Sequence, residues 1–181
     1  AVAWQALYEG VLHKKVKGEF FLKLCIKHLP QEKNNLVVNR TLSFLRIIYS
    51  TYLDEGSRQL IQDDLERFCI NMVNNKAEGK NKKSYFNTLL SICSSPKSCS
   101  YLSSVLKGEQ DLPEDVTINE QDKISIAFNL VLRDTSVYED TKAYIMRTVK
   151  NKDLLDRFEY VYPSLSGDKQ VRDSVFNALL V

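Results

Sequence analysis

Hydrophobic side chains recur every three or four positions along most of the chain, which is the spacing of one face of an α-helix. The clearest case is a helix predicted over about residues 34–53. One side of this helix is expected to be lined by Val37, Thr41, Phe44, Ile48 and Tyr52, with Leu45 and Tyr49 widening the stripe. Two-residue alternation, which is typical of a half-buried strand, is hard to find. The pattern therefore predicts an all-α protein.

A second helix is predicted after Gly56, and it is expected to end near Asn74 and Asn75. Its apolar side chains fall together on one face and comprise Ile61, Leu65, Phe68, Cys69, Met72 and Val73. Its charged side chains are expected mostly on the opposite face and comprise Asp63, Asp64, Glu66 and Arg67. The polar loop KAEGKNKK, residues 76–83, follows this helix.

Residues typical of helix ends mark the next helix. Ser95 and Pro96 predict its start, because a hydroxyl caps the first N–H groups and proline needs no partner at the first helical position. Gly108 predicts its end, since glycine adopts the left-handed conformation that closes many helices. The apolar residues between them are Tyr101, Leu102, Val105 and Leu106.

Three further helix starts are predicted in the last third of the chain. Asn119 can cap a helix in which Asp122 is favoured by the positive end of the helix dipole. The inner stripe of that helix is expected to be Ile124, Ala127, Phe128 and Val131. Asn151 and Asp168 are expected to cap two more helices.

Short polar turns between the predicted helices favour antiparallel neighbours. We expect about nine or ten helices in an irregular array of antiparallel helix pairs, a HEAT-like or ARM-like superhelix, that forms a single helical domain over residues 1–181. A tetratricopeptide or ankyrin consensus is not found, so the array is expected to be irregular. A closed helical bundle is the alternative.

Composition indicates a globular protein. The chain has 181 residues, of which 44% are hydrophobic and 27% charged, with four prolines and six glycines. Its 25 basic and 23 acidic residues nearly cancel, so the whole chain has no field to attract nucleic acid or an anionic membrane. No targeting segment or membrane-spanning run is apparent. A first residue other than methionine is expected for an excised domain or a processed chain, and equally for a trimmed tag.

Two clusters of lysines interrupt this balance. The first comprises Lys14, Lys15, Lys17, Lys23 and Lys27, and the second comprises Lys76, Lys80, Lys82 and Lys83. Nucleic-acid sites normally add aromatic platforms or a docking element, which neither cluster has. We therefore expect solvated faces. The acidic segment 108–122 is expected to be a linker between helices that could meet either cluster within the fold.

The cysteines and histidines do not form a metal motif. Cys25, Cys69, Cys93 and Cys99 contain no closely spaced pair of the kind that structural zinc sites need, so buried thiols are expected. A Cys93–Cys99 disulfide across the intervening turn is left open.

The two histidines are widely separated. His13 is expected on the surface, and His28 as a cation at a helix C-terminus before Pro30. Because they are fifteen residues apart, their side chains are not expected to converge on a metal ion.

Catalytic motifs are also absent from the sequence. It contains no H-E-x-x-H, G-x-S-x-G, phosphate loop or dinucleotide fingerprint. The carboxylates at 63–64 and 114–115 are adjacent in sequence and are expected to be solvated. We assign no catalytic, cofactor-binding or metal residue in this chain.

Aromatic residues near the C-terminus could form a ligand box or a packing contact. The group comprises Phe158, Tyr160, Tyr162 and Phe176. Phe158, Val161 and Leu165 recur at helical steps, which favours packing between the last two helices. Pro163 is expected to bend or end the first of these helices.

Two long segments, residues 89–134 and 150–180, resemble the C-terminal helical region of zinc aminopeptidases of the aminopeptidase N type, particularly bacterial forms. One motif of this region is RFE-x-x-x-P-x-L-S, a packing and turn motif formed here by Arg157, Phe158, Glu159, Pro163, Leu165 and Ser166. The segments LPQEKNNL at 29–36 and IIYSTYL at 47–53 look like the start of the same region.

The resemblance implies that the chain is the non-catalytic C-terminal domain of a longer metallo-aminopeptidase. In that family an upstream thermolysin-like domain supplies H-E-x-x-H and a distant glutamate as zinc ligands, the motif glutamate as general base, and a Gly-x-Met-Glu-Asn loop for the substrate amine. None of these motifs occurs in this sequence. The zinc would therefore belong to the catalytic domain of the parent enzyme, and this chain would need no cofactor.

The partners implied are the catalytic domain of the same polypeptide and the peptide substrate, with no nucleic acid and no membrane. The domain would cap the catalytic domain and restrict substrate access. Arg40 or Arg46 could meet the carboxylate end of a peptide, although no family motif supports this assignment. The alternative function is a free-standing helical-repeat module for protein interaction.

Overall fold

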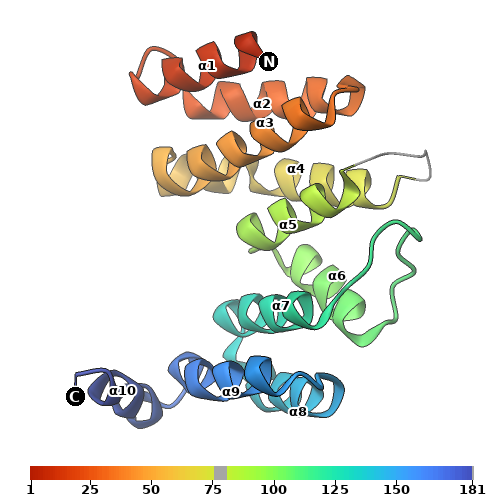
Figure 1. Ribbon diagram of the computed structural model, residues 1–181. Coiled ribbons are helices and arrows are strands. Elements are labelled where there is room, and N and C mark those ends of the chain that lie inside the picture. The colour runs from red at the N-terminus through yellow and green to blue at the C-terminus, as the bar shows by residue number, and fades with distance from the viewer. Residues whose placement is uncertain (76–80, 181) are drawn as a thin grey trace. The chain divides into compact units, whose positions relative to one another are not determined.

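The computed structural model describes residues 1–75 and 81–180. These residues form ten α-helices and no strand, which confirms the predicted all-α fold of about ten helices (Figure 1). The helices are α1 Val2–Leu12, α2 Gly18–His28, α3 Asn35–Ile47, α4 Glu55–Val73, α5 Lys82–Ile92, α6 Pro96–Lys107, α7 Glu120–Arg133, α8 Tyr138–Thr148, α9 Lys152–Val161 and α10 Lys169–Ala178. Four short helical turns join them, η1 Leu29–Gln31, η2 Ile48–Tyr52, η3 Thr135–Val137 and η4 Tyr162–Leu165.

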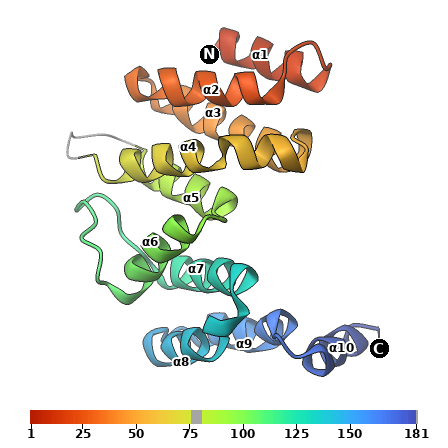
Figure 2. The ribbon, with the colours of Figure 1, turned by 180° about the vertical axis from the view of Figure 1, so that it is seen from behind.

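The chain forms two compact units. The first unit consists of Ala1–Ser98 together with Leu112–Thr117, and the second consists of Cys99–Asp111 and Ile118–Val181. In the first unit α4 packs on α5 and on α2, and in the second α7 packs on α8 and α9 (Figures 1 and 2). Whether the two units fold together as the single domain expected from the sequence stays a prediction.

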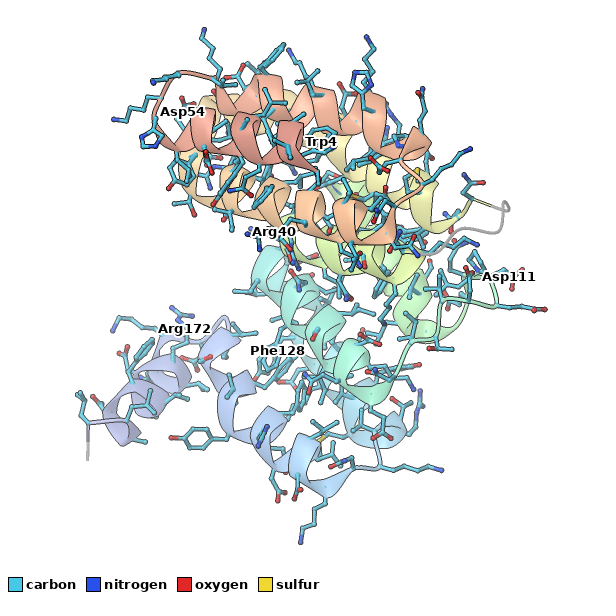
Figure 3. All side chains as sticks on the ribbon, turned by 45° about the horizontal axis from the view of Figure 1, so that its top comes forward. Trp4, Arg40, Asp54, Asp111, Phe128 and Arg172 are labelled. Atoms are coloured by element: carbon cyan, nitrogen blue, oxygen red, sulfur yellow. The ribbon has the colours of Figure 1, made fainter. Side chains whose placement is uncertain are left out.

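Aliphatic and aromatic side chains from successive helices fill the core of the first unit. Fully buried members include Phe21, Leu22, Leu45, Ile48, Leu65, Phe86 and Leu89. Burial of one such side chain contributes about 1.5 to 3 kcal/mol. Trp4 on α1, labelled in Figure 3, meets Phe21 of α2 edge to face, with ring centroids 5.7 Å apart. These contacts fix α1 on α2.

The helix predicted over about residues 34–53 is α3 continued by the η2 turn. Its predicted start is confirmed, because the side chain of Asn34 accepts hydrogen bonds from the backbone N–H groups of Leu36 at 3.0 Å and Val37 at 3.3 Å. The prediction for Tyr52 is wrong, since this side chain is 45% exposed. The η2 turn is a π-helical turn, whose wider spacing moves Tyr52 off the buried stripe.

α4 begins at Glu55, so Gly56 lies inside the helix and not before it as predicted, and the C-cap is Asn74, as expected. Asp54 caps it by accepting a hydrogen bond from the Ser57 backbone N–H at 2.8 Å. As predicted, Asp63, Asp64 and Arg67 are exposed. The apolar stripe of this helix is buried as predicted, except that Met72 is half-buried. The predicted placement of Glu66 is wrong, because this side chain is buried at 1% exposure.

The predicted caps of the later helices are confirmed. Ser95 caps α6 through a hydrogen bond from the Ser98 backbone N–H at 3.2 Å, and the helix stops before Gly108, whose φ is +73°. Asn119 and Asp122 form a reciprocal capping box at the start of α7, each side chain accepting from the other residue's N–H at 2.9 Å.

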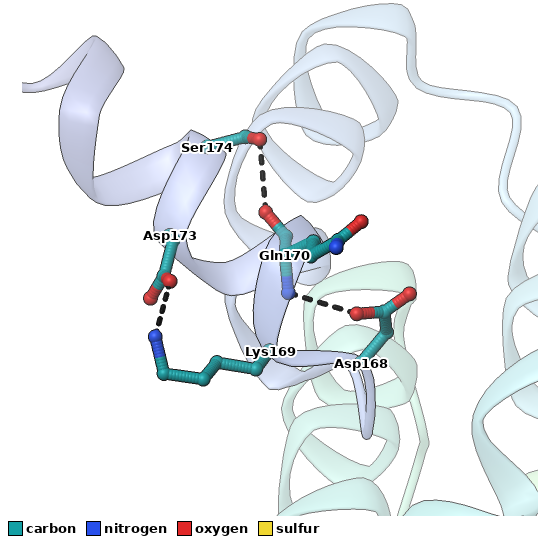
Figure 4. Close-up of polar contacts among 5 residues, drawn as sticks. All are labelled: Asp168, Lys169, Gln170, Asp173 and Ser174. Atoms are coloured by element: carbon teal, nitrogen blue, oxygen red, sulfur yellow. Dashed lines mark hydrogen bonds and ion pairs between the residues drawn. The ribbon is translucent and has the colours of Figure 1, made fainter.

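Side-chain caps also start the last two helices. Asn151 caps α9 by accepting from the Leu154 N–H at 3.2 Å. Asp168 caps α10 by accepting from the Gln170 N–H at 2.8 Å (Figure 4). Four local sequence signals thus place the starts of four helices.

Candidate functional site

The candidate metal ligands do not converge. In residues 1–75 and 81–180, no group of three or more His, Cys, Asp or Glu side chains is placed to hold a metal ion. His28 is the last residue of α2, as predicted, and His13 is an exposed residue that follows α1.

The four cysteines are thiols. Cys25, Cys69 and Cys93 are buried as predicted, whereas Cys99 is only partly buried. Burial raises the pKa of the Cys25 thiol well above its ordinary value, and it does the same to the pKa of Cys69, where the charge of Glu66 adds to the shift. A thiol that is hard to ionise is a poor nucleophile, so these two buried cysteines act as core residues.

The second lysine cluster is engaged within the fold. Lys76 and Lys80 lie outside the described residues. Lys82 has a side chain only 8% exposed, and its Nζ lies 2.9 Å from Oδ1 of Asp115. Lys83 donates to the backbone carbonyl of Thr117 at 3.0 Å.

These contacts correct the expectation of a solvated face at Lys82. They also confirm that most of the acidic segment 108–122 links two helices and meets a lysine cluster, while its last three residues form the first turn of α7. The segment between Leu112 and Thr117 is held on the first unit by both lysines.

Arg40 and Arg46 lie on different faces of α3, because residues six apart on a helix do not face the same way. The guanidinium of Arg40, which is labelled in Figure 3, lies 4.8 Å from the centroid of the Phe44 ring. The Phe44 ring stacks on that of Tyr8 of α1, with centroids 4.1 Å apart. Arg46 donates to the Ser43 hydroxyl at 3.3 Å. Arg40 is thus an exposed cation on an aromatic base, and the two guanidinium groups do not form one carboxylate site.

A buried carboxylate on α4 was missed by the sequence analysis. Oε1 of Glu66 accepts hydrogen bonds from the backbone N–H groups of Ser94 at 2.7 Å and Ser95 at 3.2 Å. Its Oε2 accepts from the Ser95 hydroxyl, and Gln62 donates both to Glu66 and to the Ser94 hydroxyl. The carboxylate therefore holds the turn between α5 and α6 and is occupied by protein donors.

The sequence did carry a signal for this position. Glu66 precedes Cys69 by three residues and Val73 by seven, so it falls on the same helical stripe as two residues expected to be buried. A charged residue within an apolar stripe indicates a buried hydrogen-bonding role.

The C-terminal aromatic group divides into buried and exposed members. Tyr162 is fully buried, and its ring lies 4.3 Å from that of Phe158 and 4.6 Å from that of Tyr138. Its hydroxyl donates to the Tyr138 backbone carbonyl at 2.9 Å. The interpretation as core is confirmed for Phe158 and Tyr162, which pack toward α7 and α8.

The predicted packing between the last two helices is wrong for the other members. Tyr160 is 58% exposed and Phe176 on α10 is 60% exposed. The buried side of α9 faces the preceding helices, so the ring of Phe176 is left in solvent. Pro163 lies in η4 directly after α9, as expected for a residue that ends the helix.

The carboxylate pairs lie in solvent, as predicted. Asp63, Asp64, Glu114 and Asp115 are all exposed. Asp64 forms an ion pair with Arg67 on the same helix, and Asp115 pairs with Lys82. Neither pair is positioned for acid–base chemistry by its surroundings.

Comparison with known proteins identifies no family, since no family model matches the chain and no curated protein is significantly similar to it. Among the described helices, none combines the length and apolar character needed to span a bilayer.

Proposed function

We propose that this chain is the non-catalytic C-terminal helical domain of a zinc-dependent aminopeptidase of the aminopeptidase N type. The domain caps a catalytic domain of the same polypeptide and restricts the access of peptides. The observation that carries the proposal is the motif RFE-x-x-x-P-x-L-S at residues 157–166.

The positions of the motif residues support an architectural role for it. Phe158 is buried against the rings of Phe128 and Tyr162, and Pro163 lies in η4, where α9 has ended. The Ser166 backbone N–H donates to the Pro163 carbonyl at 3.1 Å, and the Ser166 hydroxyl accepts from the Asp168 N–H at 3.1 Å. The motif therefore builds the corner between α9 and α10.

Arg172 strengthens the same corner from α10. Its Nη1 donates to the Ser166 carbonyl at 2.5 Å. The exposed side of α10 carries its own polar contacts, including the Lys169–Asp173 ion pair and the bond from Ser174 to the Gln170 carbonyl (Figure 4). A corner with this many local bonds suits a motif that preserves shape.

The direct test compares residues 1–181 with the complete reading frame that encodes them, on an aminoacyl chromogenic substrate with and without a chelator. We expect turnover only from the longer chain, and loss of that turnover on chelation. Hydrolysis by residues 1–181 alone, or a reading frame without an upstream H-E-x-x-H, contradicts the proposal.

A variant pair tests the capping role within the longer chain. Phe158→Ala should loosen the corner and raise the turnover of a long peptide relative to that of the small chromogenic substrate. Tyr160→Ala is the matched control, since it removes an exposed ring from the same helix. Equal ratios in both variants would argue against restriction of access by this domain.

The free-standing interaction module is supported by apolar side chains on the surface of the second unit. These are Tyr160, Val161, Phe176, Leu179 and Leu180, each at least 45% exposed. Exposed apolar side chains that gather on one face can mark an interaction surface. A start codon immediately before Ala1 would favour this alternative.

A further inference from the structure

The first lysine cluster is exposed on the first unit, in the turn before α2 and on α2 itself. We call it the α2 basic surface and define it as Lys14, Lys15, Lys17, Lys23 and Lys27, all of which are exposed. The first three lie in the turn between α1 and α2, and the other two lie on the outer side of α2.

The turn that presents three of these lysines has a defined backbone. Lys14 adopts a left-handed conformation with φ of +57°. The N–H groups of Lys15 and Val16 both donate to the Gly10 carbonyl, at 2.8 and 3.0 Å. A Cβ at Gly10 would lie 2.7 Å from Cγ2 of Val16, so the close approach of this turn to α1 depends on glycine. The lysines are therefore presented on a preformed scaffold.

The outer side of α2 combines cations with one exposed aromatic ring. Phe20, Lys23 and Lys27 follow one another at helical spacing on the same face. Phe20 is 53% exposed, whereas its neighbours Phe21 and Leu22 are completely buried. The buried side fixes the helix, and the apolar ring is left in solvent among the lysines.

None of the five lysines forms an ion pair with a carboxylate of residues 1–75 or 81–180. The acidic residues of the same helices have other partners, since Glu19 accepts from the Ser57 hydroxyl at 2.5 Å and Glu9 accepts from Gln5 at 2.9 Å. Unpaired cations within a screening length of about 8 Å repel one another, and a bound anion relieves that repulsion.

The geometry points to an acidic polypeptide segment with an aromatic residue among its carboxylates as the partner of the α2 basic surface. α2 spans about 16 Å at about 1.5 Å per residue, which an extended peptide covers with about five residues. Carboxylates would meet the lysines, and the aromatic residue would pack on Phe20. This inference is independent of the aminopeptidase proposal.

A nucleic acid fits this surface less well. Single-stranded nucleic acids use several aromatic platforms, and the surface has one exposed ring. The cluster also contains no arginine, the residue that holds phosphate through paired hydrogen bonds. A long polyanion would also extend beyond the five lysines. There it would meet a surface that is nearly neutral, since the chain has 23 acidic residues and a net charge of only +2.

Fluorescence anisotropy with a labelled peptide of sequence Asp-Glu-Asp-Phe-Glu-Asp tests the inference on the full chain. We expect saturable binding that weakens as salt is raised from about 50 to about 300 mM. The double variant Lys23→Gln with Lys27→Gln should weaken binding about fivefold, since an exposed ion pair contributes a factor of about two or three. Lys107→Gln with Lys152→Gln is the control, because it removes the same charge from exposed positions of the second unit.

The aromatic contact has a separate test. Phe20→Ser should weaken binding of this peptide but leave a peptide with alanine in place of phenylalanine unaffected, and circular dichroism checks that each variant keeps its helices. Equal weakening by both lysine pairs, or binding unchanged by the Lys23 and Lys27 substitutions, overturns the site. Tighter binding of oligothymidylate of equal charge overturns the acidic peptide as partner.

Discussion

The carboxylate of Glu66 on α4 accepts both the backbone N–H and the hydroxyl of Ser95, the residue that caps α6. One buried side chain therefore joins three successive helices, because Ser95 also closes the turn that follows α5. The interaction matters for stability because a buried donor without an acceptor costs about 1 to 3 kcal/mol.

Glu66→Gln should lower the free energy of unfolding by about 1 kcal/mol, because its amide oxygen can still accept from the Ser94 and Ser95 N–H groups while its NH2 group cannot accept from the Ser95 hydroxyl. Glu66→Leu should cost about 3 kcal/mol or more, because both N–H groups then lack a partner. Urea denaturation measures both values. Asp63→Asn, at an exposed position of the same helix, should stay within about 0.5 kcal/mol of the parent. A Glu66→Leu variant as stable as the parent would contradict the capping role.

Asp115→Asn should release the linker segment from the first unit. It leaves the buried ammonium group of Lys82 without its counter-ion, which should cost about 1 to 2 kcal/mol given that Asp115 itself is half exposed. Hydrogen exchange of the amides between Leu112 and Thr117 should become faster. The neighbouring substitution Glu114→Gln should leave these amides unchanged, and equal acceleration by both would show that the ion pair is not the anchor.

Tyr162 is expected to contribute mainly through its ring. Tyr162→Phe removes the hydrogen bond to the Tyr138 carbonyl and should cost about 1 kcal/mol, whereas Tyr162→Ala should cost about 3 to 5 kcal/mol through the cavity it leaves. Thermal unfolding gives the comparison. Tyr160→Ala, on the exposed side of α9, should change the midpoint little. A similar loss in both alanine variants would be incompatible with the packing described.

Stability should fall at alkaline pH. Burial raises the pKa of Tyr85 and Tyr162 above the ordinary 10.0, and that of Cys25 and Cys69 above the ordinary 9.0. The folded protein thus holds these protons more tightly than the unfolded chain. Their contribution is fully present below pH 9 and is lost as the pH rises through and beyond the ordinary values. Urea midpoints between about pH 8 and about pH 11 should show this decline, which Tyr85→Phe with Tyr162→Phe should make shallower.

Much of the fold follows from local sequence signals. Asn34, Ser95, Asn119 and Asp168 cap helices because each has a short polar side chain that reaches the N–H groups two or three residues ahead. Such bonds form within a few residues, so the sequence around them is sufficient to predict them. The apolar stripes of α4 and α7 were also predictable from local sequence, because helical periodicity brings together side chains three or four residues apart.

The predictions that proved wrong all concern contacts between residues distant in the sequence or a local change of helical spacing. Tyr52 left its stripe because η2 widens the turn, which periodicity at ordinary helical spacing does not anticipate. The burial of Glu66 and Lys82 was not predicted because the partners that satisfy them lie about thirty residues away along the chain. Phe176 lies in solvent because α9 packs its apolar side on α7, a choice of partner that no local pattern specifies.

The return of residues 112–117 to the first unit sets an order for biosynthesis. During translation the five helices up to Ile92 emerge early, but the acid that neutralises Lys82 emerges only with Asp115, after the whole of α6. The nascent first unit therefore lacks the counter-ion of Lys82 until Asp115 has left the exit tunnel of the ribosome. A chain truncated at Ser98 would never gain the carboxylate of Asp115 that pairs with Lys82.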